Sequence, residues 1–576
     1  MVGFQLTVLS KEFFEAVLRD NHKPIKQLYY NTLRIYNTML PISMKNNKFS
    51  RLLLFGLLGL MATTACKKSS TTPDEPVTPP VVTTPSGTRE ELTKDSIFLY
   101  GKELYYWNTS LPTYEVFNPR SFSSNEAELY AMTQYSNDPS TGKPYEYVSS
   151  SAEPKYSFFD YTAATTGKTG ALKADVNGSA NDYGFSVNYS TADDLRVKYV
   201  YPNSPAALQG LTRGCRITSI NGRTNLTYST SNVSFLNGAI FGTNPSVSLV
   251  FTDLNNNTKT VVVSSASYTV NPILYTHVYT VGAKKVGYIV FNSFTNNATA
   301  GLNSAFANFA TQGVSELIVD LRYNGGGYVS TATQILNLAA PIAQNGNIMF
   351  TSYYNSYLQN ITTAQRKASI LAHQPLLDDA GKLQTFTTGV NGKYATYADL
   401  NYSATSADNI ERFAKSGNLA LSRVYFIVTG ATASASELTI NSLKPVMDVK
   451  LIGKTTYGKP VGFFPIRIDK LDMYIPEFET KNQAGNGGYY SGLTVDKDAY
   501  EDFKKDFGDE TETYLYYALA YANTGAFPLT APKTASLKTS TLPLSSTLST
   551  EEIKSVDAHL DPNGFKGMIM TPHGKM

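Results

Sequence analysis

The sequence has few cysteines and histidines, and its net charge is small. Its 576 residues include two cysteines and five histidines, and the histidines are scattered without the spacing of metal ligands. The cysteines, Cys66 and Cys215, stand in very different sequence contexts, which argues against a disulfide framework. A formal net charge of only +3 gives no reason to expect nucleic-acid binding. We therefore expect no metal, no other cofactor and no nucleic-acid partner.

The N-terminal region has the layout of a secretory signal that starts at an internal methionine. After Met44, basic residues precede the short apolar run Leu52 to Met61, which is too short to span a bilayer. Small residues then lead to Cys66 and resemble a bacterial lipobox, which implies cleavage before Cys66 and its acylation. We expect residues 44–65 to be the signal peptide and residues 1–43 to be a mis-called extension. A signal peptide with an incidental cysteine is the alternative.

Residues 66–88 are rich in threonine, proline and serine and lack apolar periodicity. Proline keeps such a segment partly extended, so it would tether a folded body to a membrane. The basic pair Lys67-Lys68 offers no acidic cue for surface export. We expect a lipid-anchored protein of the bacterial cell envelope, at the periplasmic face of the outer membrane.

Two small regions follow the tether. In residues 89–166, apolar residues at roughly helical spacing predict a helical domain, with a second helix around Asn125 to Tyr135. Residues 170–270 read as short strands and turns, with Gly184, Phe185, Ser186 and Val187 just before a strand. The order of elements there resembles a PDZ domain of the circularly arranged bacterial kind. The resemblance implies that Gly184 to Val187 bind the terminal carboxylate of a peptide, which adds a strand to the sheet edge. A generic β-rich module is the alternative, and Cys215 is expected to be a buried apolar residue.

Residues 271–530 alternate between strand-like and helix-like patterns, which predicts an α/β core of βαβ units within a multidomain α+β chain. Residues 341–421 are expected to be an inserted cap or an elaborated loop. A hairpin is expected over residues 466–478. Residues 531–576 form a tail rich in threonine, serine and lysine, with one short helix expected at Glu551 to Leu560.

The segment Val424 to Phe463 holds the strongest candidate for a chemical site. A buried strand leads through a small-residue loop to a helix that opens at Ser434, and a second apolar run ends in a loop that carries Lys459. A strand, loop and helix start can expose a serine on a rigid scaffold. No histidine lies in this segment, so a Ser-His-Asp triad is poorly supported. The alternative is that Ser434 caps the helix in a capping box with Glu437, and the residues alone leave both interpretations open.

Lys459 can act as a base only if it is neutral. Its unperturbed pKa is about 10.4, so a dry site would have to lower it by roughly 3 units. Apolar side chains surround it in the sequence, and no Asp or Glu lies between Lys454 and Pro465. The glycine loop at Asn324 to Gly327 lacks nucleotide-binding spacings and suits an oxyanion instead.

Three motifs together resemble the C-terminal processing (tail-specific) serine peptidases. They are Thr432-Ala-Ser-Ala-Ser-Glu437, Gly453-Lys-Thr-Thr-Tyr-Gly-Lys459 and Asp320-Leu-Arg-Tyr-Asn-Gly-Gly-Gly327. The resemblance covers roughly residues 89–530 and implies a crotonase/ClpP-like peptidase core. It implies Ser434, not Ser436, as the nucleophile and Lys459 as the base. It also implies an oxyanion hole of backbone N–H groups, from Ala435 and from Gly326 or Gly327.

One position departs from that family's pattern. Several members carry a glutamine four residues after the lysine as a third polar partner, and here the position is Phe463. Candidates for a replacement are Thr456, Glu479 and Asn482.

The expected function is a lipid-anchored serine endopeptidase that hydrolyses peptide bonds of proteins with a Ser-Lys dyad and recognises substrate C-termini through the PDZ-like region. Two other functions are a non-catalytic periplasmic PDZ scaffold and a glycan- or nutrient-binding lipoprotein. The sequence leaves the substrate and the oligomeric state open.

Overall fold

The computed structural model describes residues 86–149, 151–161, 178–377, 382–384, 389–390, 392–530, 560 and 567–570. The chain divides into two units, Met1–Val81 and Val82–Met576, and all described residues belong to the second. The expected signal peptide, Cys66, most of the tether and the expected helix at 551–559 lie outside the described residues. Within those residues, no helix has the length and apolar character needed to cross a membrane.

Helices occupy residues 89–133 of the region predicted to be helical, and the described residues from 134 to 161 hold no helix. Thr88 caps its first helix in a capping box with Glu91, and buried apolar residues lie along one side of that helix. The elements are α4 (Arg89–Leu104), η1 (Asn108–Ser110), α5 (Tyr114–Phe117), η2 (Pro119–Ser121) and α6 (Asn125–Thr133). The last element, β1 (Phe158–Asp160), pairs antiparallel with a strand more than 300 residues later, β19 (Leu471–Tyr474). The helical region is therefore joined to the C-terminal half of the chain by a shared sheet.

The middle module (residues 178–270) is built around a five-stranded sheet of order β3-β4-β5-β6-β7, with a separate β2–β8 pair. Cys215 is fully buried in its apolar cluster, as predicted. The elements are β2 (Ser179–Asp182), β3 (Phe185–Thr191), β4 (Asp194–Val200), α8 (Pro205–Leu208), β5 (Arg216–Ile220), α9 (Thr230–Ile240), β6 (Ser246–Thr252), β7 (Thr258–Ser264) and β8 (Ala266–Thr269).

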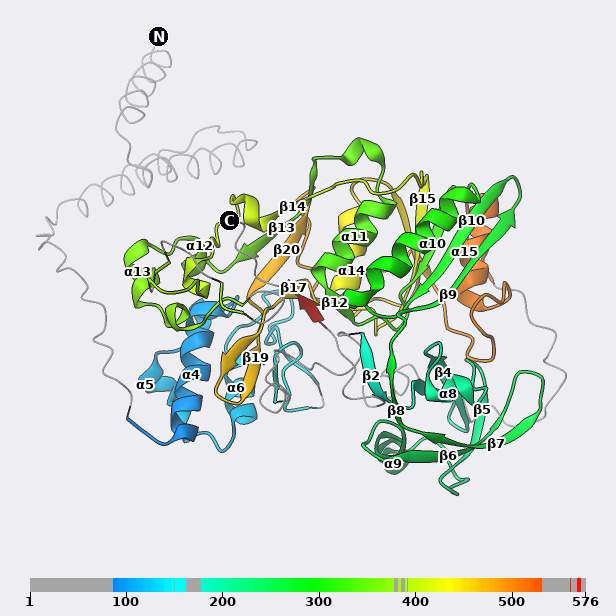
Figure 1. Cartoon of the computed structure of the whole chain (residues 1–576), viewed down its shortest axis with the longest axis horizontal. Coiled ribbons are helices and arrows are strands. Elements are labelled where there is room, and N and C mark those ends of the chain that lie inside the picture. The colour runs from blue at the N-terminus through cyan, green and yellow to red at the C-terminus, as the bar shows by residue number, and fades with distance from the viewer. Residues whose placement is uncertain are drawn as a thin grey trace, which may run out of the picture. The chain divides into compact units, whose positions relative to one another are not determined.

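The central sheet has the order β21-β16-β15-β11-β10-β9. Its strands are parallel except for β9, as the predicted βαβ pattern requires. The strands are β9 (Ile273–Val281), β10 (Lys284–Phe291), β11 (Glu316–Asp320), β15 (Arg423–Val428), β16 (Asp448–Gly453) and β21 (Lys497–Asp498). Helices lie on both faces of this sheet (Figure 1). They are η3 (Asn296–Ala298), α10 (Thr299–Thr311), α11 (Val329–Ala339), α14 (Ala435–Leu443) and α15 (Thr513–Thr524).

The side chains of β15 alternate between the two layers of helices that cover the central sheet. In β15, Val424, Phe426 and Val428 share a buried cluster with residues of α10, α11 and α14. Tyr425 and Ile427 point to the opposite face and share a cluster with residues of α15. Both faces of the strand are therefore buried, and its apolar run is continuous in the sequence.

The inserted segment 341–421 is more than the cap or loop expected from its polar composition. Its strand β13 (Ile348–Tyr354) lies inside a second sheet of order β14-β13-β20-β17, and Met349 is fully buried. The other strands are β14 (Ile410–Arg412), β17 (Val461–Gly462) and β20 (Phe478–Asn482). The segment also holds η4 (Ile342–Gln344), α12 (Ser356–Gln359), α13 (Thr363–Ala368), η5 (Ile370–His373), η6 (Tyr397–Asp399) and η7 (Ala407–Asn409).

The hairpin expected over residues 466–478 exists but is shorter. Strand β18 (Ile466–Ile468) pairs with β19, which ends at Tyr474. Phe478 begins β20 in the second sheet instead. A further two-stranded pair joins β12 (Gly326–Tyr328) to β22 (Gly567–Ile569) from the end of the chain.

Candidate active site

Ser434 stands at the junction of the loop after β15 and the start of α14. Its backbone has φ 60° and ψ −109°, a conformation that costs an L-residue on the order of 1–3 kcal/mol. The side chain is fully buried, and Oγ has no hydrogen-bond partner among the described residues. Its N–H donates to Glu437 Oε2 at 2.8 Å, as a capping box requires, but the hydroxyl makes no capping hydrogen bond. Ser434 and Glu437 therefore occupy the two positions of a capping box, and the serine hydroxyl is left without a hydrogen bond among the described residues.

The carboxylate of Glu437 connects the serine to the lysine loop. It accepts the N–H groups of Ser434, Gly458 and Lys459 at 2.8 Å each, and the hydroxyl of Thr456. Burial raises the pKa of Glu437, and these four donors act in the opposite direction. One buried side chain therefore fixes the backbone on both sides of the site. Thr456, a candidate partner for the lysine, contacts this carboxylate.

Lys459 is fully buried. Its Nζ lies 4.0 Å from the ring centroid of Phe463 and 3.4 Å from the carbonyl oxygen of Tyr156, to which it donates. Burial lowers the pKa of Lys459 to about 7, although the charges of Glu146, Glu437 and Glu477 act to raise it. The expectation of a depressed lysine pKa agrees with this environment.

The absence of carboxylates near Lys459 holds in the sequence but not in space. Glu146 comes from the helical region and accepts the N–H groups of Tyr156 and Ser157 and the hydroxyl of Tyr105. Glu477 precedes β20, accepts the N–H of Phe464 at 2.7 Å, and has a pKa raised well above its ordinary value by burial. Burial of the lysine outweighs these carboxylates.

Sequence reasoning missed the contribution of the helical region. Tyr156 lies 303 positions before Lys459 along the chain, and its hydroxyl donates to the carbonyl of Gly458 at 2.6 Å. No local motif marks Tyr156 or Glu146, because their role depends on the pairing of β1 with β19.

The other two candidate partners of the lysine make other contacts. Glu479 accepts hydrogen bonds from the hydroxyls of Tyr106 and Tyr490. The amide of Asn482 donates to Asn441. The position that follows the lysine by four residues is filled by the ring of Phe463, which contacts the ammonium group directly.

The glycine loop lies against the serine loop. The Ala433 N–H and the Ser436 hydroxyl both donate to the carbonyl of Asn324, so Ser436 is engaged in holding the two loops together. The N–H of Gly326 donates to Asn324 Oδ1 at 2.9 Å. Gly326 has φ 109°, and a Cβ there would lie 2.2 Å from the Gly567 carbonyl oxygen and 3.1 Å from the Ala435 nitrogen, so the position requires glycine. Of the two candidate glycines, Gly326 already uses its N–H within the loop.

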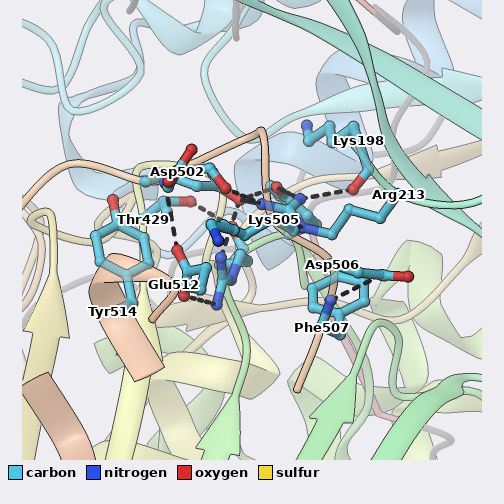
Figure 2. A network of polar contacts seen from close by, with 12 residues as sticks. Lys198, Arg213, Thr429, Asp502, Lys505, Asp506, Phe507, Glu512 and Tyr514 are labelled. Atoms are coloured by element: carbon cyan, nitrogen blue, oxygen red, sulfur yellow. Dashed lines mark hydrogen bonds and ion pairs between the residues drawn. The ribbon is translucent and has the colours of Figure 1, made fainter. Parts of the chain in front are cut away.

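A second cluster of buried charges begins two residues before that loop. Arg322 Nη2 donates to Asp320 Oδ2 at 2.6 Å and to Glu512 Oε2 at 3.1 Å, and Nη1 donates to Glu501 at 3.1 Å. Arg213 of the middle module donates to the same Glu501 oxygen at 2.6 Å. Figure 2 shows the surroundings of Arg213 and Glu512 in this network. The shared Glu501 joins the middle module to the end of β11.

The proposed peptide-binding residues begin the edge strand of the middle module. Phe185, Ser186 and Val187 are buried, and β3 is an outer strand of its sheet. The N–H of Gly184 donates to Asp182 Oδ1 at 2.7 Å. The structure therefore puts them at a sheet edge, and their binding role stays a prediction.

In the described part of the chain, no group of three or more His, Cys, Asp or Glu is arranged to hold a metal ion.

Residues 285–475 match the sequence profile described as Peptidase family S41. A "C-terminal processing peptidase, chloroplastic" of Tetradesmus obliquus is 27% identical over 190 residues, which cover 31% of this chain and 40% of that protein. A "Carboxyl-terminal-processing protease" of Picosynechococcus sp. is 24% identical over 294 residues, covering 50% and 56% respectively. The chain thus spans about half the length of these curated relatives.

Solved structures with similar folds include a putative S41 protease from Bacteroides fragilis NCTC 9343. It is 21% identical with a TM-score of 0.48, and the alignment covers 75% of this chain and 97% of that one. A photosystem II D1 C-terminal processing protease is 17% identical with a TM-score of 0.39, covering 72% and 94% respectively.

Proposed function

We propose that this chain, which contains a peptidase family S41 domain and is related to C-terminal processing peptidases, is a serine endopeptidase with a Ser434–Lys459 dyad. In this proposal the protein is anchored by acylated Cys66 at the periplasmic face of the outer membrane. Its substrates are proteins, and the middle module acts as a PDZ-like receptor that binds their C-termini at Gly184 to Val187.

The chemistry is acyl transfer through the serine. Neutral Lys459 takes the proton from Ser434 Oγ as that oxygen forms a bond to a peptide carbonyl carbon. The N–H groups of Ala435 and Gly327 stabilise the oxyanion, which is typically a large contribution. Lys459 then gives its proton to the leaving amine. Water, deprotonated by the same lysine, hydrolyses the acyl-enzyme and releases the serine.

One observation carries the proposal. Glu437 accepts N–H groups from both Ser434 and Lys459, and burial lowers the pKa of Lys459 to about 7. A base whose pKa lies near the working pH combines a neutral fraction with useful basicity. An ordinary loop lysine would not need complete burial.

The test compares variants on an unfolded protein substrate. We expect Ser434→Ala and Lys459→Ala each to lose at least about 10⁴-fold in kcat/KM, because the two groups act as one unit. Ser436→Ala is the matched control, since its hydroxyl binds the Asn324 carbonyl, and it should keep most of the activity. Activity retained in Ser434→Ala would overturn the dyad. A wild-type chain that binds C-terminal peptides without cleaving any substrate would favour a scaffold.

A further inference from the structure

The last described segment of the chain lies against the glycine loop. Strand β22 pairs in parallel with β12, so that Gly567, Met568 and Ile569 face Gly326, Gly327 and Tyr328 respectively. The N–H of Gly567 donates to the carbonyl of Gly325 at 2.9 Å. Figure 1 shows this segment as the red arrow beside β12. A segment from the end of the chain therefore adds a strand to the loop that follows β11.

The other edge of the same segment is also bound. The N–H of Phe463 donates to the Met568 carbonyl at 2.9 Å, and the N–H of Met570 donates to the Phe463 carbonyl at 3.0 Å. The segment thus lies between the glycine loop and the loop that follows Lys459. Main-chain hydrogen bonds on both edges are the contacts by which an extended peptide is held regardless of its sequence.

Side chains of the segment are buried. Met568 is fully buried, and Ile569 is 5% exposed. Ile569 packs in a small cluster with aromatic walls, formed by Phe158, Tyr328, Phe463 and Tyr474. This pocket holds an aliphatic side chain, and Phe463 forms one of its walls.

The segment passes the oxyanion donors of the proposed dyad. The carbonyl oxygen of Gly567 would lie 2.2 Å from a Cβ on Gly326, and the Ala435 nitrogen would lie 3.1 Å from the same point. In a parallel pair of this register the Gly567 carbonyl faces the N–H of Gly327. A substrate carbonyl would have to take this space.

If the middle module holds a substrate's C-terminus, as the proposed function has it, the segment runs in the direction opposite to that substrate. Leu560, upstream of it, belongs to the buried cluster of the middle module, so in chain order the contact with that module comes before the contact with the site. A substrate whose C-terminus is held by the module would run from the site to the module. A reversed strand can fill the groove without presenting a carbonyl for attack in the substrate's orientation.

We propose that residues 567–570 are a cis-acting inhibitor that occupies the substrate groove beside Ser434 and must leave before an extended peptide can bind. The peptides that replace it share its chemistry: an extended backbone and an aliphatic side chain in the Ile569 pocket. No covalent step is involved.

The first experiment removes the segment from the full chain. The variant lacks residues 567–576, and the matched control lacks only residues 571–576 and keeps β22. A tethered segment has an effective concentration on the order of 1 mM, so a tail with a Kd of about 100 μM leaves about a tenth of the sites free. We expect the longer deletion to raise kcat/KM on a short C-terminally amidated peptide about tenfold through a lower KM, with kcat unchanged. The control should match the full chain, and Ile569→Asp should match the longer deletion.

The second experiment measures binding without catalysis. A fluorescent peptide with the sequence of residues 564–576 should bind the Ser434→Ala chain that lacks residues 567–576. It should bind at least about tenfold more weakly to the full-length Ser434→Ala chain, whose own tail competes. A peptide with Asp in place of Ile569 should not bind either chain.

Three outcomes would contradict the proposal that residues 567–570 inhibit the enzyme. These are equal activity of the long deletion and its control, equal peptide binding by the two Ser434→Ala chains, or cleavage of the peptide within residues 567–570 by active enzyme. A further result separates the two proposals. If no version of the chain cleaves any substrate while the two Ser434→Ala chains still differ in peptide binding, the proposed function is wrong, but the proposal that residues 567–570 occupy the peptide groove is supported.

Discussion

Arg322 and Lys459 are both buried cations, and their surroundings are opposite. Arg322 is held by three carboxylates, those of Asp320, Glu501 and Glu512, and its pKa is raised by them against the effect of burial. Lys459 faces an aromatic ring and a main-chain carbonyl, and burial lowers its pKa to about 7.

Under the proposed function, the difference separates a structural charge, Arg322, from a reactive one, Lys459. The guanidinium of Arg322 keeps its proton at any working pH, so it serves to fix the approach to the glycine loop. The amine of Lys459 changes its charge near neutral pH, because desolvation penalises the ammonium form more than the nearby carboxylates stabilise it. Burial alone therefore does not identify a catalytic group, because the neighbouring side chains decide whether a buried cation keeps its proton near neutral pH.

The largest effect is expected from Lys459→Arg. A guanidinium stays protonated and cannot take the serine proton, so kcat/KM should fall at least about 10⁴-fold, as in Lys459→Ala. Steady-state kinetics on a quenched peptide would measure this. If the Lys459→Arg variant kept a tenth of the wild-type kcat/KM, the side chain at position 459 would contribute a positive charge and would not act as a base.

Arg322→Met should break the structural side of the comparison. It leaves the buried carboxylates without their partner, and removal of one member of a buried ion pair typically costs about 3–5 kcal/mol. Urea unfolding would measure the loss. Lys454→Met is the control, because its partner Asp498 is largely exposed and such a pair contributes at most about 1 kcal/mol. Equal stabilities of the two variants would contradict the assignment of Arg322 as a structural charge.

Glu437→Gln should weaken both stability and rate. A glutamine side chain has one oxygen, so about two of the four donors lose their acceptor, at about 1–3 kcal/mol each. Displacement of the serine and lysine loops should lower kcat about 100-fold. Loss of a charge that raises the pKa of Lys459 should also move the pH midpoint of kcat/KM below 7. Glu479→Gln, whose carboxylate binds tyrosine hydroxyls, is the control and should leave this midpoint unchanged.

The smallest effect concerns pH and Phe463. Lys459 must be neutral to act as a base, so kcat/KM should rise with pH around a midpoint of about 7. Because the folded pKa of Lys459 lies below its unfolded value, the buried lysine destabilises the fold fully below pH 7, and the free energy of unfolding should rise between about pH 7 and 10.4.

Phe463→Gln should raise the pH midpoint of kcat/KM by less than about one unit, since it adds a polar group beside the ammonium. Phe463→Leu should leave it unchanged, and an identical profile for all three proteins would exclude Phe463 as a source of the low pKa.

Much of the central sheet could be predicted, because its strands are buried on both faces and read as continuous apolar runs. The strand over Val424 to Val428 could be predicted for this reason, and the helix after Ser434 follows it directly in the sequence. Strand β13 was not, because its tyrosines, serine and threonine read as a polar loop until β14 and β20 are paired on either side. Ser434 and Lys459 lie in one local segment, whereas Tyr156, Glu146 and β22 reach the site only through long-range pairing.

The pairing of β1 with β19 bears on what counts as the smallest catalytic unit. Residues 285–475 hold Ser434 and Lys459 but lack Tyr156, Glu146 and Glu477. A fragment cut at those limits would open the lysine to water, and its pKa would return toward about 10.4, leaving roughly four molecules in ten thousand neutral at pH 7. Under the proposed function, a fragment therefore has to keep Glu146, Tyr156 and Glu477 together with Ser434 and Lys459.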